Sequence, residues 1–266
     1  MRVQELAFVH PDAIIGENVV IEPFVTISAN VEIGDNCWIG SHAVIMDNAI
    51  IGSGTRIFPG AVVSAIPQDL KFQGEESRVI IGENVTIREY VTINRGTIDR
   101  HQTVIGDDTL IMAYAHVAHD TIIGRHCVIA NSVNLAGHIQ IGDWVVIGGM
   151  CAVQQFVKLG RHSFITGGSL VRKDVPPFVK AAREPLSYVG VNSVGMRRRG
   201  FSQEDIHHVQ DIYRILFVNG RNVSHAIDRI EADVPASRLR DEILRFVRAS
   251  DRGVMRGFNH VNDHHA

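Results

Sequence analysis

An aliphatic residue recurs at every sixth position along most of this chain. In the series from Val9 to Val171, 25 of the 28 positions are Ile, Val or Leu, and the exceptions are Asp69, Glu75 and Asp99. The next residue is Gly in ten of those 25 hexads, which we interpret as a place where the backbone bends without a Cβ. A period of six fits neither a helix nor a plain strand. It predicts short strands joined by turns, three to a coil.

The composition agrees with a stacked coil. The 266 residues include 31 Ile and 33 Val against 10 Leu, and β-branched residues favour strands. We therefore expect a parallel β-helix of hexapeptide repeats over residues 1–177, with the aliphatic positions inside. Pro176 and Pro177 end it, because proline cannot donate to a ladder. Segments 69–80 and 99–104 interrupt the repeat and are expected to leave the coil as loops.

A different pattern follows the two prolines. Residues 178–200 are expected to form a basic linker, and residues 201–266 a small helical domain. Ser202 and Asp205 resemble a capping box ahead of apolar residues at helical spacing. Two later apolar clusters, which include Ile230 and Ile243, predict two more helices.

Charge is unevenly distributed along the chain. Residues 1–155 carry a net charge of −9, residues 156–200 carry +7 and residues 201–266 carry −1. The basic band suggests an anionic ligand or partner, although a solvated surface band would look the same. No apolar run reaches the roughly 18 residues of a membrane span, so we do not expect an integral membrane protein. Nucleic acid is not among the expected partners. Three cysteines form no disulfide or metal pattern, which fits a reducing cytosol.

Residues 18 apart should stack about 4.8 Å from each other in such a coil. One column then holds His119, Gly137 and Gln155, together with His101 unless the loop displaces it, and the next holds Asp120, His138 and Phe156. Polar groups around a glycine gap indicate a site, and histidine suits general base work near neutral pH. The alternative is a row of solvent-facing turn residues in a chain that has 14 histidines.

Several segments carry a close family resemblance. They are QDLKF (68–72), LIMAYAHVAHDTIIG (110–124), NLAGHIQIGD (134–143), VVIGGMCAVQQF (145–156), DVPPF (174–178) and VGVNSVGMRRRGFS (189–202). In these the chain resembles the UDP-N-acetylglucosamine O-acyltransferases, hexapeptide-repeat enzymes that open lipid A biosynthesis. The resemblance implies a left-handed coil and transfer of an (R)-3-hydroxyacyl group from acyl carrier protein to the glucosamine 3-hydroxyl of UDP-N-acetylglucosamine. It also implies a homotrimer in the cytoplasm of a Gram-negative bacterium. The resemblance implies no metal and no cofactor of the enzyme itself, because the 4'-phosphopantetheine is carried by the acyl carrier protein.

The resemblance further implies residue roles. His119 matches the catalytic base, Asp120 the acid that orients it, and Gly137 the backbone N–H donor to the oxyanion. Residues that match substrate contacts are Gln68, Lys71, His116, His138, Gln155, Asn192, Arg198 and Arg199. Those that match the acyl-chain pocket are Gly149, Gly167 and Gly168. The chain departs from the family pattern at Asn94 and Gln154, where members carry histidine, and at Val194, where they carry glutamate.

Three alternatives remain open at this point. The N-acyltransferase of the same pathway has an extra domain before its repeats, whereas here the repeats begin at Val9. A carbonic anhydrase on the same solenoid would bind zinc through three histidines across subunits, for which His116, His119 and His138 are candidates. A purely structural solenoid would have no loops and no polar corner.

Overall fold

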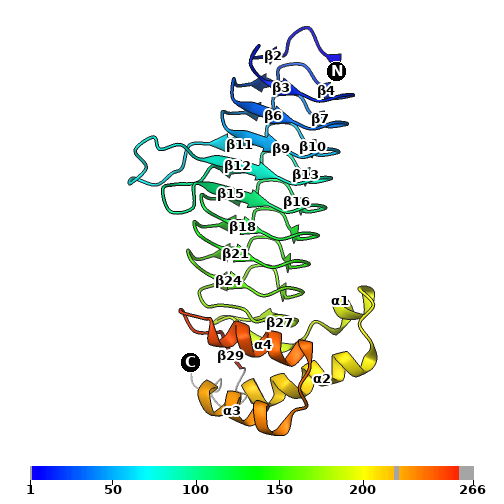
Figure 1. Ribbon diagram of the computed structural model, residues 1–266, viewed down its shortest axis with the longest axis vertical. Helices are drawn as coiled ribbons and strands as arrows, with labels where there is room; N and C mark the ends of the chain where they lie inside the picture. The colour runs from blue at the N-terminus through cyan, green and yellow to red at the C-terminus, as the bar shows by residue number, and fades with distance from the viewer. Residues whose placement is uncertain (1, 219–221, 258–266) are drawn as a thin grey trace.

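The computed structural model describes residues 2–218 and 222–257 and shows a parallel β-helix that ends on a group of helices (Figure 1). Three sheets of short parallel strands, called A, B and C, form the walls of the coil. Each turn of the chain passes through B, then C, then A. Across the face nearest the viewer in Figure 1 it runs from left to right as it descends, the sense of a left-handed coil. The expected β-helix is confirmed.

Each sheet is built from every third strand. Sheet A contains β1 (Arg2–Val3), β4 (Val20–Ile21), β7 (Trp38–Ile39), β10 (Arg56–Ile57), β13 (Thr86–Ile87), β16 (Leu110–Ile111), β19 (Val128–Ile129), β22 (Val146–Ile147), β25 (Phe164–Ile165), β27 (Val179–Ala182), β28 (Ser187–Val191) and β29 (Arg256–Gly257). Sheet B contains β2 (Phe8–Val9), β5 (Thr26–Ile27), β8 (Val44–Ile45), β11 (Val62–Ala65), β14 (Thr92–Asn94), β17 (His116–Val117), β20 (Asn134–Leu135), β23 (Ala152–Val153) and β26 (Leu170–Val171). Sheet C contains β3 (Ile14–Ile15), β6 (Val31–Ile33), β9 (Ala49–Ile51), β12 (Arg78–Ile81), β15 (Gln102–Ile105), β18 (Ile122–Ile123), β21 (Gln140–Ile141) and β24 (Lys158–Leu159).

The sixth-position aliphatics fill the interior, as the period predicts. In sheet A, Ile39 pairs with Ile57 in the next coil, and both are fully buried. The same stacking continues through Ile111, Ile129 and Ile147. Buried aliphatic columns in register fix which face of each strand points inward.

The two interruptions begin and end earlier in the chain than the sequence pattern indicates, because β11 (Val62–Ala65) and β14 (Thr92–Asn94) end before them. Strand β12 begins at Arg78, so the first loop ends at Ser77 rather than at residue 80. Strand β15 begins at Gln102, so the second excursion ends at His101 instead of covering 99–104. These strands carry one more buried residue each, Val79 and Thr103, and the two strands pair with each other along four residues.

The glycine that follows the aliphatic position serves a purpose other than the one expected. The left-handed backbone conformation falls two residues later, for example at Asn36 and His126. At Gly34 and Gly106, instead, a Cβ would lie 2.7 Å from main-chain atoms of the next coil, Ser53 N and Gly124 C. Glycine is therefore needed for the close approach of successive turns.

The segment after the prolines is more structured than a linker. Strands β27 and β28 pair antiparallel there, and the short helix α1 (Ser193–Arg198) follows. Helix α2 (Gln203–Tyr213) begins with the expected capping box and continues as the π-helix η1 (Arg214–Val218). Helices α3 (Val223–Asp233) and α4 (Arg238–Arg248) confirm the other two expected helices. The domain boundaries at 177 and 200 stay predictions, and residues 258–266 lie outside the described part of the chain.

Candidate active site

The polar corner lies where the chain turns from sheet B to sheet C. His119 and Asp120 stand between β17 and β18, and Gly137 and His138 occupy the same turn one coil later. The main chain ties the two turns together, because the N–H of His138 donates to the carbonyl of His119 at 3.0 Å. The β-helix therefore brings these four residues together, as the column arithmetic predicts.

His119 and Asp120 form a buried pair. Nδ1 of His119 lies 2.8 Å from Oδ2 of Asp120. An ionised carboxylate only accepts hydrogen bonds, so the ring proton lies on Nδ1 and Nε2 is left with a lone pair. This is the arrangement of a general base whose ring is oriented by an acid.

Asp120 is held by the second excursion of the chain. The backbone N–H of Thr97 donates to both carboxylate oxygens at 3.0 and 3.1 Å, and the Thr97 hydroxyl donates to Oδ2 at 2.6 Å. The backbone N–H of Arg100 adds a bond of 3.2 Å. Burial raises the pKa of Asp120, but the hydrogen bonds from His119 and Thr97 outweigh burial and lower the pKa to about 2. The carboxylate is thus charged at neutral pH.

Gly137 lies directly beneath the ring of His119. A Cβ on Gly137 would stand 2.6 Å from Cε1 and 2.7 Å from Nε2 of His119, closer than atoms can approach. Among the described residues, the N–H of Gly137 makes no main-chain hydrogen bond, although those of Ala136 and His138 do. A donor is therefore available beside the basic nitrogen of His119.

Two more histidines complete the corner. The ring of His138 meets the ring of His119 edge to face, with centroids 4.9 Å apart. His116 lies on β17, and its Nδ1 is 2.8 Å from the hydroxyl of Thr92. Burial, followed by the charge of His119, lowers the pKa of His116, which favours its neutral form.

His101 and Gln155 do not join this cluster closely. His101 leaves the column, and its Nδ1 lies 3.0 Å from the carbonyl of Glu76 in the first loop. Gln155 is exposed one coil beyond Gly137.

Sequence reasoning missed the residues that the two interruptions bring to this corner, among them Thr97 and Asp69. Oδ2 of Asp69 lies 3.9 Å from Nε2 of His119, so a second carboxylate borders the basic nitrogen. Asp69 interrupts the aliphatic series and lies within QDLKF, but a loop has no register from which to place its side chain. Gln68 and Lys71, in the same loop, are exposed.

The other expected site residues lie at the remaining two corners. At the turn from C to A, Asn192 donates to the carbonyl of His162 at 2.9 Å and caps α1. The Arg199 guanidinium lies 5.1 Å from the centroid of Trp144, and Arg198 is exposed. In one chain, therefore, these residues do not meet His119.

The three glycines of the expected acyl pocket lie at the turn from A to B. Gly149 and Gly167 are neighbours, since a Cβ on Gly167 would stand 3.1 Å from the Gly149 carbonyl oxygen. Gly168 has a φ of +74° and open space where its Cβ would be.

The positions that depart from the family pattern differ in burial. Asn94 is buried and donates to the carbonyl of Ile66, which anchors the start of the first loop. Gln154 and Val194 are exposed.

Within one chain, a zinc site built on His116, His119 and His138 does not match this geometry. Within the described ranges, the group able to hold a metal is His119, Asp120 and His138, and it does not contain His116. Asp120 already accepts bonds from Thr97, Arg100 and His119, so it has little capacity left for an ion.

Known proteins resemble this chain over nearly its whole length. Family models match at residues 174–255 (UDP-N-acetylglucosamine O-acyltransferase, domain 2), at 102–137 (bacterial transferase hexapeptide) and at 3–107 (GMPPB C-terminal domain). The acyl-[acyl-carrier-protein]–UDP-N-acetylglucosamine O-acyltransferase of Chlorobium phaeobacteroides is 53% identical over 95% of this chain and 97% of its own length. That of Myxococcus xanthus is 41% identical over 96% and 99%. This chain belongs to the UDP-N-acetylglucosamine O-acyltransferase family.

Solved structures place the chain in the same family. The UDP-N-acetylglucosamine acyltransferase of Bacteroides fragilis superposes with a TM-score of 0.94 at 49% identity, over 96% of this chain and all of the other. The Francisella novicida enzyme gives 0.93 at 35% identity, over 97% and 95%. In the described part of the chain, no helix is both long and apolar enough to cross a membrane.

Proposed function

We propose that this chain transfers an (R)-3-hydroxyacyl group from acyl carrier protein to the 3-hydroxyl of UDP-N-acetylglucosamine, the first step of lipid A biosynthesis. The observation that carries the proposal is the His119 ring, which is fixed by Asp120 on one side and lies against Gly137 on the other. Family membership supplies the substrates, since relatives of the same length are named for this reaction.

The proposed mechanism needs no acyl-enzyme. Nε2 of His119 removes the proton from the sugar hydroxyl while its oxygen attacks the thioester carbonyl. The carbonyl becomes a tetrahedral oxyanion, which the N–H of Gly137 stabilises. When the intermediate collapses, the C–S bond breaks and His119 returns the proton to the leaving thiol of the carrier's phosphopantetheine. A base of this kind contributes on the order of 10²- to 10⁴-fold in rate.

Asp120 supports this cycle through its charge. A carboxylate with a pKa of about 2 stays ionised throughout and stabilises the imidazolium that forms when His119 takes the proton. His116 and Gln155 are proposed as further substrate contacts, and His138 is proposed as one beside the base.

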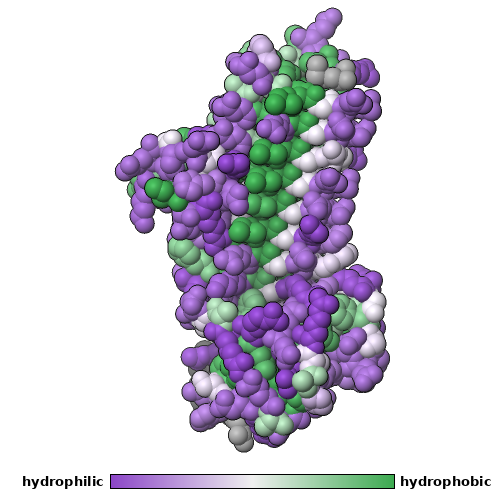
Figure 2. All heavy atoms as spheres, in the orientation of Figure 1, coloured by the Kyte–Doolittle hydropathy of each residue, from purple (hydrophilic) through white to green (hydrophobic). Residues whose placement is uncertain are grey.

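We propose a homotrimer because the expected contacts occupy three different corners of one chain. Arg198 and Arg199, at the corner between sheets C and A, would meet a His119 corner only across subunits, whereas the loop that holds Gln68 and Lys71 already reaches His119 of its own chain through Asp69. The surface supports an interface: the outward positions of sheet C include Ile14, Ile50, Ile80, Val104 and Ile122. Figure 2 shows an apolar band along the coil, larger than scattered exposed residues would give.

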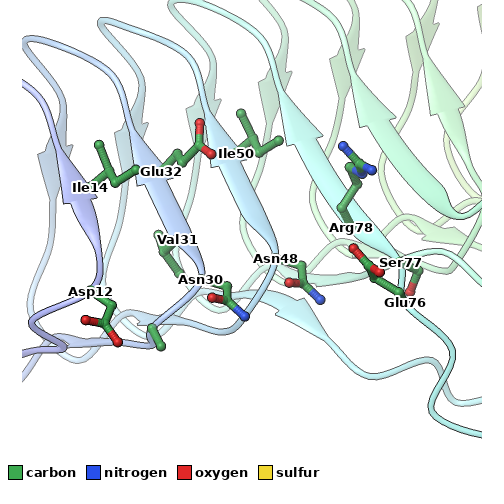
Figure 3. A pocket seen from close by; sticks show the side chains of 11 residues that line it. Asp12, Ile14, Asn30, Val31, Glu32, Asn48, Ile50, Glu76, Ser77 and Arg78 are labelled. Carbon is green, nitrogen blue, oxygen red and sulfur yellow. The ribbon is translucent and has the colours of Figure 1, made fainter.

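The first coils show how this face is composed. In Figure 3, Ile14, Glu32 and Ile50 project from neighbouring strands of sheet C, above a row of polar side chains that includes Asn30 and Asn48. An apolar stripe with a polar border is typical of a protein–protein interface.

We also propose ligands for the basic residues between 156 and 200. Asn192, Arg198 and Arg199 are proposed to bind the uridine diphosphate, since arginine pairs well with phosphate. The wider band at 156–200 suits the acidic acyl carrier protein. Both substrates belong to the cytoplasm, so we assign the reaction to the cytoplasm of a Gram-negative bacterium.

The test is product identification by mass spectrometry. The protein is mixed with UDP-N-acetylglucosamine and a panel of (R)-3-hydroxyacyl carrier proteins of different chain length. We expect an alkali-labile ester of UDP-N-acetylglucosamine, and no product at all would refute the proposal. In a parallel reaction with UDP-3-O-acylglucosamine as the acceptor, formation of an amide in place of that ester would favour the N-acyltransferase. Repeating the panel with Gly168→Met tests the proposed pocket of Gly149, Gly167 and Gly168, because unchanged chain preference would contradict it.

A further inference from the structure

His138 is paired with a carboxylate of its own. Its Nδ1 lies 2.9 Å from Oδ2 of Asp99, a residue 39 positions earlier in the second excursion of the chain. The Asp99 side chain is 57% exposed, whereas that of His138 is 11% exposed. A surface carboxylate thus reaches inward to a nearly buried ring.

Stacking fixes the plane of the His138 ring, but it does not determine which of the two ring edges faces Asp99. Phe156 stacks on His138, with centroids 4.4 Å apart and planes 6° apart. A 180° rotation about the Cβ–Cγ bond would keep that stacking and exchange the two edges of the imidazole. The bond to Asp99 distinguishes the two edges, because a carboxylate accepts only from a ring N–H.

The orientation of the His138 ring matters because charged groups surround it. Oδ2 of Asp120 lies 3.9 Å from the same Nδ1, and it is the atom that His119 uses. Arg100 contributes the remaining nearby charge, with Nε 3.9 Å from Asp99 Oδ2. Without Asp99, the acceptor left for His138 is the carboxylate that orients the base.

We propose that Asp99 is a positioning residue for His138. It holds the ring proton on Nδ1, keeps His138 from competing for Asp120, and leaves Nε2 of His138 as the nitrogen available to substrate. The consequence for acyl transfer rests on the function proposed above, whereas the state of the ring does not.

The Asp99 side chain is 57% exposed, and substitutions at exposed positions change the free energy of unfolding little, so Asp99 variants should fold normally. The chain also offers a matched control. His126 and Asp108 form a similar pair at the corner between sheets C and A, with Nδ1 and Oδ2 3.5 Å apart. Asp108→Asn removes a carboxylate from such a pair away from His138, but His126 stacks on Trp144, over which Arg199 lies, so the kcat of this variant is the control and its KM is not.

The experiment compares wild type, Asp99→Ala, Asp99→Asn and Asp108→Asn in two measurements. Long-range ¹H–¹⁵N spectra of histidine-labelled protein report which ring nitrogen of His138 is protonated. Steady-state kinetics report kcat and KM for UDP-N-acetylglucosamine. In wild type we expect the Nδ1–H form. In Asp99→Ala we expect a mixture of forms and a kcat lower by about tenfold, the lower end for lost orienting partners.

Asp99→Asn separates geometry from charge. The amide oxygen can still accept from Nδ1, so we expect the wild-type tautomer and most of the kcat. An Asp99→Ala protein with wild-type tautomer and kcat would overturn the proposal, as would an equal loss in Asp108→Asn. If wild type does not acylate UDP-N-acetylglucosamine, the proposed function fails, and the spectra alone decide whether Asp99 sets the ring.

Discussion

Gly137 matters at the scale of a single residue because the His119 ring occupies the space of its missing side chain. With a Cβ only 2.6 Å from that ring, Gly137→Ala must displace His119. We expect kcat to fall on the order of 10²-fold, since a misplacement of about 1 Å costs that much. Circular dichroism and Tm should stay close to wild type. Near wild-type turnover in this variant would show that the ring position is not critical.

Asp120 gives a pH signature in stability. Its pKa is about 2 in the folded chain against an ordinary value of 3.8. A lowered carboxyl pKa stabilises the fold above the unfolded pKa, and the contribution is lost as pH falls through the folded pKa. The free energy of unfolding of wild type, relative to Asp120→Asn, should therefore drop by about 2 kcal/mol between pH of about 4 and 2. Urea titrations at several pH values measure this, and a constant difference would contradict the assignment.

At the scale of elements, the repeat explains most of what sequence could predict. The period placed Ile39, Ile57 and Ile129 in buried columns, and it placed His119 over Gly137, because a solenoid turns spacing into position. The hexad period could not predict the structure of the two interruptions. Thr97 and Asp99 lie in a segment without register, so no spacing predicted that they reach Asp120 and His138.

The segment after the prolines shows the same limit. Its strands β27 and β28 carry no hexad pattern, so the sequence suggested a linker there. Nor could it predict that α1 places Arg199 beside Trp144, at a different corner from His119. Residue type predicted the chemistry of these arginines, but only the fold determines their position.

The buried carboxylate of Asp174 stabilises the end of the coil through several hydrogen bonds. Asp174 accepts from the backbone N–H of Lys158 at 2.8 Å and from the hydroxyl of Ser250 at 2.7 Å. Its own backbone N–H and carbonyl bond to Gly253 and Met255. Asp174→Ala leaves buried groups without partners and should cost about 1–3 kcal/mol in the free energy of unfolding.

Asp251→Ala is the matched control for that variant. Asp251 also contacts Lys158, but its side chain is 89% exposed, so its removal should cost less than about 1 kcal/mol. Equal losses of stability in the two variants would show that the buried bonds of Asp174 are unimportant.

At the scale of the whole molecule, the apolar face of sheet C should hold copies together. Ile122→Glu would place a charge in the middle of the expected interface, where burial of an unpaired carboxylate is costly. Light scattering after size exclusion should show a trimer for wild type and a smaller species for this variant. Val218→Glu, at a residue of the C-terminal helices that is 60% exposed, should remain a trimer. A wild-type monomer would contradict the proposed assembly.

His119 is the proposed base for acyl transfer to the sugar hydroxyl. The most direct measurement compares kcat of wild type and His119→Ala with UDP-N-acetylglucosamine and a hydroxyacyl carrier protein, after the variant's fold and oligomeric state are verified. We predict a loss on the order of 10²- to 10⁴-fold with the assembly intact. A correctly assembled His119→Ala protein that turns over at nearly the wild-type rate would contradict the account.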